Sequence, residues 1–292
     1  MLTSTLIEAI SVGAMYAVIA LGVALIVGVG RIMNFAHGEL IMIAGYGVAL
    51  TSAVAWPAAV ALAIVCAILA AAAMELGVFR WARKADPTTL LIIAFALSQF
   101  IQALTMMLFG ATAVSTSFGV ALSERIDLLG LSVSKLTLVT LGAALALLAF
   151  FSFVLLRTTF GLRLRAASED FVMARMVGVR VNRTILGAFL LSGLAAGVGG
   201  VLLMAQVGSV TPTFGVQPLL IAFVAMIIGG LGSLPGAVVG GLMIGIVSMF
   251  LQSYLPPEIA GLRDSFVYAL VIAILLFRPQ GLFKGTQIGE RI

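Results

Sequence analysis

The sequence predicts an all-α polytopic membrane protein with about nine transmembrane helices, in a range of eight to ten. Of its 292 residues, 62% are hydrophobic and only 9% are charged, whereas soluble domains carry about a quarter charged residues. The mean hydropathy is +1.25, and apolar runs follow one another along the whole chain. We therefore expect a single transmembrane domain over residues 1–292 and exclude the soluble fold classes.

Nine apolar runs are the predicted spans. A helix needs about 20 mostly apolar residues to cross the hydrocarbon core, and several of the runs are shorter than that. We expect the segments around Gly38 and around 230–236 to be short or re-entrant. The runs are 6–29, 40–56, 58–79, 90–110, 135–156, 184–204, 217–232, 236–255 and 264–278.

The positions of the cations predict the orientation. In a nine-span chain, Arg125, Lys135 and Arg263 fall on one side, and the other 13 of the 16 lysines and arginines fall on the opposite side. Because Lys and Arg accumulate in cytoplasmic loops, we expect the rich side to be cytoplasmic, the N-terminus outside and the C-terminus inside. An even number of spans would move one terminus. The 13 cations are Arg31, Arg80, Arg83, Lys84, Arg157, Arg163, Arg165, Arg175, Arg180, Arg183, Arg278, Lys284 and Arg291.

Glycines interrupt or pack several of these spans. The stretch "GGLGSLPG" at 229–236 holds four glycines and a proline in eight residues, which a regular helix does not tolerate. The pairs Gly193/Gly197 and Gly236/Gly240 have the small-xxx-small spacing that lets helix backbones approach closely in lipid. Hinges in broken helices that line a transport path are the alternative role for such glycines.

The stretch "GVGRIMNFAHGELIMIAGYGV" at 28–48 gathers rare polar residues between two apolar runs, among them Asn34, the single histidine His37, and Glu39. Two interpretations remain open. In the first, this is a capped cytoplasmic turn in which Asn34 caps the next helix, His37 extends to the membrane surface and Glu39 occupies the favourable first turn. In the second, the turn is re-entrant, and the three residues line a gate or contact a partner chain.

Few other polar residues lie within the spans. Gln99 and Gln102 are three residues apart and share a helix face, so they are candidates for a polar lining of a transport path or for interhelical hydrogen bonds. Glu75 is the one acid clearly within a run, and we expect it to form a helix-end ion pair with Arg80. Carriers driven by ions or protons usually have more buried ionisable residues. This scarcity favours transport powered by a separate protein.

The most polar segment is "RTTFGLRLRAASEDFVMARMVGVRVNR" at 157–183, with six arginines and two acids. We expect a helix of about two and a half turns within it, capped by Ser168, with Glu169 and Asp170 in the first turn and Gly178 in the left-handed position after its end. Its apolar face suits either the anionic inner leaflet or a soluble cytoplasmic partner.

The sequence contains no residues for enzymatic chemistry. The phosphate-binding pattern GxxxxGK[ST] is absent, so the chain is not expected to hydrolyse ATP itself. One histidine and one cysteine, Cys66, cannot build a metal site. We expect no enzyme activity, no metal and no cofactor.

The segments "GLRLRAASEDFVMARMVGVRVNR", "GVGRIMNFAHGELIMIAGY", "GGLGSLPGAVVGG" and "LLFRPQGLF" together resemble the permease subunits of ABC importers for branched-chain amino acids. The resemblance covers nearly the whole chain, and the second segment is similar to the shorter of the two paired permeases. It implies the permease fold of that family, a multi-pass protein of the bacterial inner membrane, and import of hydrophobic amino acids.

The resemblance also implies partners: a second homologous permease, two ATPase subunits that bind the ATP, and a periplasmic binding protein. It assigns Glu169, Asp170, Ala174, Gly178 and Val179 to contact with the ATPase, where Val179 replaces the family's usual isoleucine. It also favours the interpretation in which residues 34–39 line a gate. Related permeases for urea, amides or sugars are an alternative, and a self-sufficient carrier or channel is another.

Overall fold

The computed structural model describes residues 2–30, 33–51, 55–83, 85–128, 131–256, 258–278 and 281–283. Helices make up most of this chain, and two short antiparallel strand pairs, β1 with β4 and β2 with β3, complete it. The helices are α1 (Leu2–Gly30), α2 (His37–Leu50), α3 (Trp56–Met74), a π-helical turn (Glu75–Phe79), α4 (Arg80–Ala82), α5 (Pro87–Phe109), α6 (Lys135–Arg157), α7 (Thr159–Glu169), α8 (Phe171–Met176), α9 (Val181–Val207), α10 (Val216–Gly229), α11 (Leu234–Tyr254) and α12 (Arg263–Phe277). The strands are β1 (Val114–Ser115), β2 (Arg125–Leu128), β3 (Leu131–Ser134) and β4 (Ser209–Val210), and 3-10 turns cover Val120–Leu122 and Ala260–Leu262.

Every predicted span corresponds to a helix, but the helices differ in length. Within the described residues, six helical segments, rather than nine, have the length and hydropathy of a full crossing. These are Thr5–Gly30, Trp56–Ala82, Pro87–Phe109, Lys135–Arg157, Val181–Val207 and Leu234–Tyr254. The helices α2 and α10 have 14 residues each, or about 21 Å at 1.5 Å per residue, and α12 has 15 residues. The expectation of short segments is confirmed for α2 near Gly38 and, around 230–236, for α10 alone, because α11 has the length of a full crossing.

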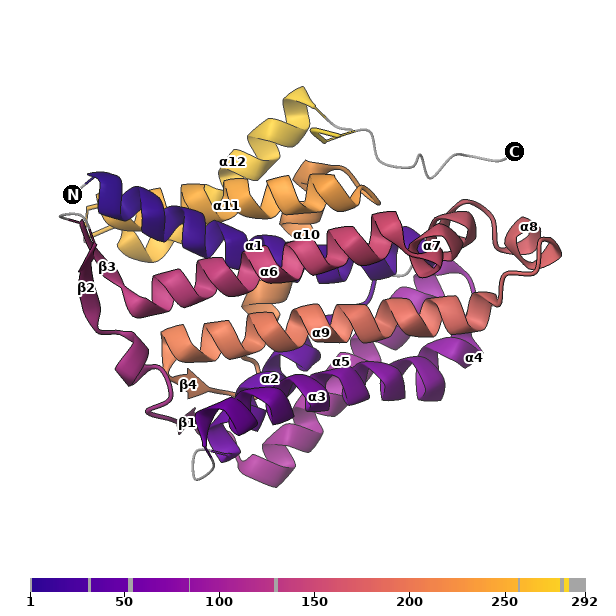
Figure 1. Cartoon of the computed structure of the whole chain (residues 1–292), viewed down its shortest axis with the longest axis horizontal. Coiled ribbons are helices and arrows are strands. Elements are labelled where there is room, and N and C mark those ends of the chain that lie inside the picture. The colour runs from indigo at the N-terminus through magenta and orange to yellow at the C-terminus, as the bar shows by residue number, and fades with distance from the viewer. Residues whose placement is uncertain are drawn as a thin grey trace.

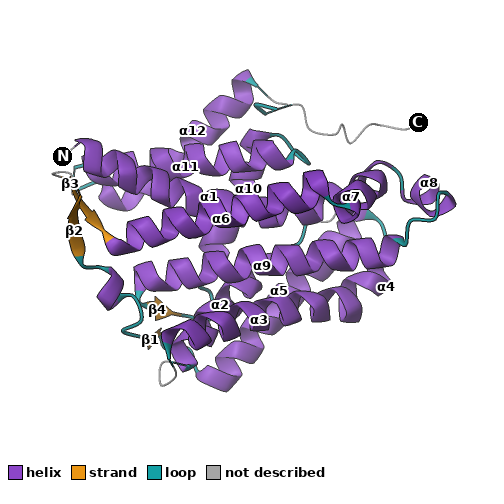
Figure 2. Cartoon of the chain, viewed as in Figure 1, coloured by secondary structure: helices purple, strands orange, loops and turns teal. Residues whose placement is uncertain are grey.

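The long helices lie roughly along one axis of the molecule. Figure 1 shows α1, α3, α6, α9 and α11 running along the horizontal axis, with the N-terminus and the β2–β3 hairpin at one end and α7 and α8 at the other. Figure 2 shows that the strands gather at the end opposite α8. The two ends of the bundle therefore differ in secondary structure, with strands at one and the short helices α7 and α8 at the other.

Close backbone contacts hold the helices together. Helix α1 contacts α6, α9, α10 and α11, and a Cβ added to Gly245 of α11 would lie 2.2 Å from the Cα of Gly13 in α1. Gly193 of α9 approaches α3 in the same way, because a Cβ there would lie 2.7 Å from the Cβ of Ala71. Lipid tails are as apolar as the helix surfaces, so tight packing of small residues takes over the role of hydrophobic burial.

The break predicted at 229–236 separates α10 from α11. Gly230 and Gly232 have φ angles of 108° and 81°, which residues with a Cβ rarely adopt. The hydroxyl of Ser233 then accepts a hydrogen bond of 3.1 Å from the amide of Gly236 and caps α11. Gly236 also packs against Gly229 across the turn.

The chain near its C-terminus closes the end of α10. The amides of Leu282 and Phe283 donate hydrogen bonds of 2.7 and 3.1 Å to the carbonyls of Ile228 and Gly229. The last carbonyls of a helix have no partner within the helix itself. The segment 281–283 therefore satisfies polar groups that would otherwise be costly to bury.

Candidate functional site

The segment 157–183, which we call the coupling segment, forms two helices and not one. Helix α7 runs through Ser168 to Glu169, and the hydroxyl of Ser168 donates 2.7 Å to the carbonyl of Arg165. The predicted cap at Ser168 is therefore wrong. The carboxylate of Asp170 caps α8 instead, accepting from the amides of Val172 at 2.7 Å and Met173 at 3.1 Å. The carboxylate of Asp170, two residues after Ser168, makes a stronger cap than the Ser168 hydroxyl because it is charged.

The end of α8 follows the prediction. Gly178 has φ of +84°, its amide donates 3.0 Å to the carbonyl of Arg175, and the amide of Val179 donates 2.9 Å to the carbonyl of Ala174. This pattern closes the last turn and directs the chain into α9. Gly178 is exposed, and a Cβ added there would meet no atom within 4 Å.

Helix α8 presents an apolar surface to solvent. The side chains of Val172, Met173, Met176 and Val177 are 63–77% exposed, and Figure 1 shows α8 standing clear of the long helices. Glu169 is also exposed, while Asp170 and Val179 are partly buried. Ala174 is different: it is 3% exposed and packs against the rest of the chain. Its small size therefore serves contact within this chain, and its assignment to contact with the ATPase stays a prediction.

The polar residues before α2 are buried. The Oδ1 atom of Asn34 accepts 3.0 Å from the amide of Ala36, and the Asn34 carbonyl accepts 3.2 Å from the amide of His37. His37 is wholly buried, and its Nδ1 lies 2.9 Å from the Oγ of Ser192. Asn34 thus forms a turn before the helix and does not cap it, because the N-cap of α2 is Ala36 and no side chain caps it. The extension of His37 to the surface is also wrong.

The burial of His37 distinguishes the two interpretations of this stretch. Ser192 is near the middle of α9, and a Cβ added to Gly22 of α1, two turns before the end of that helix, would lie 3.1 Å from the His37 ring. Helix α2 therefore begins inside the bundle and not at its end, as a re-entrant segment does. Arg31, expected to mark the cytoplasmic side here, lies outside the described residues.

Two short helices begin side by side at this point. A Cβ added to Gly215, which precedes α10, would lie 1.8 Å from the carbonyl oxygen of Gly38 in α2, and one added to Gly38 would lie 2.7 Å from the carbonyl oxygen of Gly215. The Phe35 ring, just before α2, packs in a tilted arrangement against Phe223 of α10, with the ring centroids 5.0 Å apart. The start of each helix therefore packs against the other.

Glu39 connects α2 to α5. Its Oε1 accepts a hydrogen bond of 2.7 Å from the Ser98 hydroxyl and one of 2.8 Å from the Gln102 amide nitrogen. Gln99 does not join them: it is exposed, while Gln102 is partly buried. The two amides therefore do not line the α2–α5 contact together. A spacing of three residues leaves a 60° offset between two side chains, and here the edge of the α2–α5 contact passes between them.

Several atoms of this cluster have no hydrogen-bond partner. They are Asn34 Nδ2, His37 Nε2 and Glu39 Oε2, all buried within the described part of the chain. Buried polar atoms usually have partners, so these three are unusual for a purely structural turn. We refer to Asn34, His37, Glu39, Ser98 and Gln102 as the polar cluster.

A third polar site lies at the end of α3, and the sequence predicted only part of it. Glu75 is wholly buried in the π-helical turn and forms its predicted ion pair with Arg80 at 3.9 Å, and it also pairs with Arg83, which was not predicted. Arg83 also donates 2.5 Å to the Oδ1 of Asn182 at the start of α9. Arg80 is the nearest cation to Glu75 along the chain, and the sequence carries no signal for the contact with Asn182.

Among the described residues, no group of three or more His, Cys, Asp and Glu side chains is arranged to hold a metal ion.

Comparisons with known proteins agree with this arrangement. The model of the family described as the permease component of branched-chain amino acid transport systems matches residues 5–276. The high-affinity branched-chain amino acid transport system permease protein LivH of Escherichia coli K12 is 31% identical over 298 residues, which cover 96% of this chain and 94% of the relative. The permease protein BraD of the same kind of system in Pseudomonas aeruginosa is 28% identical over 297 residues, with 97% and 96% covered. The fructose import permease protein FrcC of Rhizobium meliloti is 34% identical over 106 residues, or 34% of this chain and 29% of the relative.

Proposed function

Because the chain belongs to the permease family of branched-chain amino acid transport systems, we propose that it is the membrane-spanning subunit of an ATP-driven importer of hydrophobic, branched-chain amino acids. Two relatives with this named role match almost their whole length. The sugar permease matches only about a third of the chain, so the alternative of a sugar, urea or amide importer has less support.

The exposed apolar face of α8 is the observation that carries the proposal. A permease without a phosphate-binding loop needs a separate ATPase, and this face is an apolar patch on a helix that projects from the bundle. Exposed apolar patches mark docking sites. We propose that α8, flanked by Glu169, Asp170, Gly178 and Val179, inserts into the ATPase.

The complete importer is proposed to contain this chain, a second homologous permease, two ATPase subunits and a periplasmic binding protein. ATP is bound by the ATPases, and this chain holds no cofactor of its own. The concentration of described arginines in and around the coupling segment, against Arg125, Lys135 and Arg263 at the other end, supports an inner-membrane protein with a cytoplasmic α8 and a periplasmic N-terminus. Lys84, Lys284 and Arg291, counted in the sequence, lie outside the described residues.

The Gly178→Arg variant tests the docking proposal. A Cβ at this exposed position meets no atom within 4 Å, although the φ of +84° adds local strain. Insertion into the membrane is therefore expected to persist while a bulky cation blocks the ATPase groove. Co-purification with the tagged ATPase measures the result. Gly261→Arg is the matched control, because Gly261 is also exposed with no atom within 4 Å. Normal recovery of the ATPase with Gly178→Arg would overturn the docking assignment.

We also propose that Asn34, His37, Glu39, Gln99 and Gln102 belong to the translocation path or its gate. The polar cluster retains unpartnered buried atoms, and Gln99 is an exposed polar residue on an otherwise apolar face of α5. A zwitterionic, aliphatic substrate needs a few polar contacts along an apolar route. The exposed face of α5 is the side on which a second permease would complete that route.

The Gln99→Ala variant tests the path. We expect slower uptake of substrate by the reconstituted importer, with unchanged thermal stability, because the exposed amide makes no contact that holds this chain together. Ser152→Ala, an exposed position on α6, is the control. Wild-type uptake kinetics in Gln99→Ala would remove Gln99 from the path. Separately, uptake by vesicles that contain this chain without any ATPase would establish a self-sufficient carrier and overturn the importer proposal.

A further inference from the structure

The cytoplasmic end of α3 contains a buried ion pair that touches the base of the coupling segment. The carboxylate of Glu75 is 0% exposed and the side chain of Arg83 is 15% exposed. Arg83 bonds to Asn182, the second residue of α9, at 2.5 Å. Since the coupling segment ends at residue 183, this three-residue contact joins α3 directly to the point where the coupling segment becomes a membrane helix.

The local backbone is unusual at this position. Residues 75–79 form a π-helical turn inside the span, and such turns are rare and frequently occur at functional sites. The turn also directs Phe79, wholly buried, onto Phe189 of α9, with the ring centroids 5.4 Å apart. Two contacts about two helical turns apart on α9, Asn182 and Phe189, therefore fix this end of α3 to α9.

A buried ion pair is weak support for stability alone, because removing two charges from water offsets most of their attraction. Glu75 Oε2 and Arg83 Nε have no hydrogen-bond partner, so the pair is not the best arrangement for stability. Arg80, by contrast, has its side chain 39% exposed and is only at the limit of contact. The contact that joins α3 to α9 therefore runs from Glu75 through Arg83 to Asn182.

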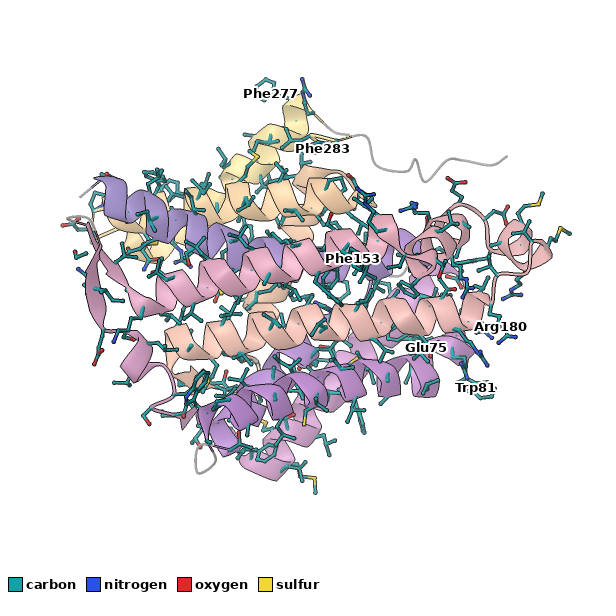
Figure 3. All side chains as sticks on the ribbon, in the orientation of Figure 1. Glu75, Trp81, Phe153, Arg180, Phe277 and Phe283 are labelled. Atoms are coloured by element: carbon teal, nitrogen blue, oxygen red, sulfur yellow. The ribbon has the colours of Figure 1, made fainter. Side chains whose placement is uncertain are left out.

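We propose that Glu75, Arg83 and Asn182 form a bracket that makes the end of α3 and the start of α9 move as one body, so that displacement of the coupling segment by the ATPase reaches the membrane helices. These are positioning residues and touch no substrate. The inference rests on the proposed function, because it assumes that an ATPase docks on α8. Figure 3 shows Glu75, Trp81 and Arg180 at this same end of the molecule.

The first experiment measures coupling in the complete reconstituted importer. In Asn182→Ala and Arg83→Gln we expect the complex to assemble and its ATPase to respond to loaded binding protein, while substrate imported per ATP falls roughly three- to tenfold. The control Arg80→Gln should remain near the wild-type ratio. A wild-type ratio in both bracket variants would overturn the proposal.

The double variant Glu75→Gln/Arg83→Gln separates positioning from simple stability. It leaves no unpaired charge, so the thermal stability lost in Arg83→Gln should return. The import-to-ATP ratio should remain low, because the connection to Asn182 is still altered. Recovery of the ratio together with stability would show that the pair only stabilises the fold, and would overturn the bracket.

A second measurement does not depend on any ATPase. Spin labels at Trp81→Cys and Val177→Cys, both highly exposed positions, in a Cys66→Ser background, report the separation of the α3 end from the coupling segment in the permease alone. We expect a narrow distance distribution that broadens in Asn182→Ala. A distribution unchanged by Asn182→Ala overturns the bracket, whereas a failure of the wild-type complex to couple ATP hydrolysis to import overturns only the proposed function.

Discussion

At the scale of single residues, the polar side chains of this membrane protein act in pairs that join different helices. Glu39 joins α2 to α5 through Ser98 and Gln102, and His37 joins α2 to α9 through Ser192. A polar group that is buried without a hydrogen-bond partner destabilises the fold, and lipid offers no alternative partner. Each pair therefore fixes where one helix lies against the next.

The pair of His37 and Ser192 leads to a stability prediction. Ser192→Ala leaves Nδ1 of a fully buried imidazole without its partner, which costs about 1–3 kcal/mol. We expect the apparent unfolding temperature of the purified protein to fall by several degrees. Ser152→Ala, exposed on α6, should leave it unchanged. Equal unfolding temperatures for the two variants would show that the His37 contact contributes nothing.

At the scale of elements, the short helices α2 and α10 explain what the glycine-rich sequence is for. Each begins with a glycine whose hydrogen faces the backbone of the other helix, at Gly38 and Gly215. Irregular backbone is tolerated at membrane depth only where it is packed in protein. The lead-in to each short helix meets this condition because it lies against the other helix.

This crossing predicts the effect of a single methyl group. In Gly215→Ala the new Cβ would lie 1.8 Å from the Gly38 carbonyl oxygen, so the two helix starts must separate, at a cost of about 1–3 kcal/mol or more. We expect a lower yield of monodisperse protein in size-exclusion chromatography. Gly142→Ala on α6, where a Cβ meets no atom within 4 Å, is the control. A yield for Gly215→Ala as high as that control would contradict this packing.

At the scale of the whole molecule, the two ends of the bundle carry different structural elements. One end holds the coupling segment and the bracket, and the other holds the β1–β4 and β2–β3 pairs together with the N-terminus (Figure 1). The exposed Gln99 lies on α5, which contacts few other helices of this chain. This asymmetry suits an importer that receives substrate at one end and energy at the other.

The orientation predicts labelling by a membrane-impermeant maleimide. The assay uses a Cys66→Ser background and cells whose outer membrane alone is permeabilised. Ser117→Cys should react in these cells from the periplasmic side. Val177→Cys should react only after the inner membrane is also opened. Ser117 lies beside the outer end of α9, since the neighbouring amide of Thr116 donates 2.9 Å to the Gly208 carbonyl. Reaction of Val177→Cys in intact cells would reverse the orientation.

The sequence by itself determined the features that local composition controls. These are the membrane class, a helix at each predicted span, the break at 229–236, the left-handed Gly178 and the helix before it, because hydropathy, glycine content and capping act over a few neighbouring residues. The motifs of residues 28–48 and 157–183 were sufficient to indicate the family. The cap at Asp170 was missed because Ser168, Glu169 and Asp170 all suit a helix start.

Only the tertiary structure decided which side chains face each other. It turned Ala174 inward and Gln99 outward, made His37 a buried contact, and added Arg83 to Arg80 as a partner of Glu75. In a soluble protein an apolar face marks the core, but in lipid the outside of a helix is as apolar as its inside. The hydropathy pattern therefore locates the helices of this protein and leaves their facing to the contacts between them.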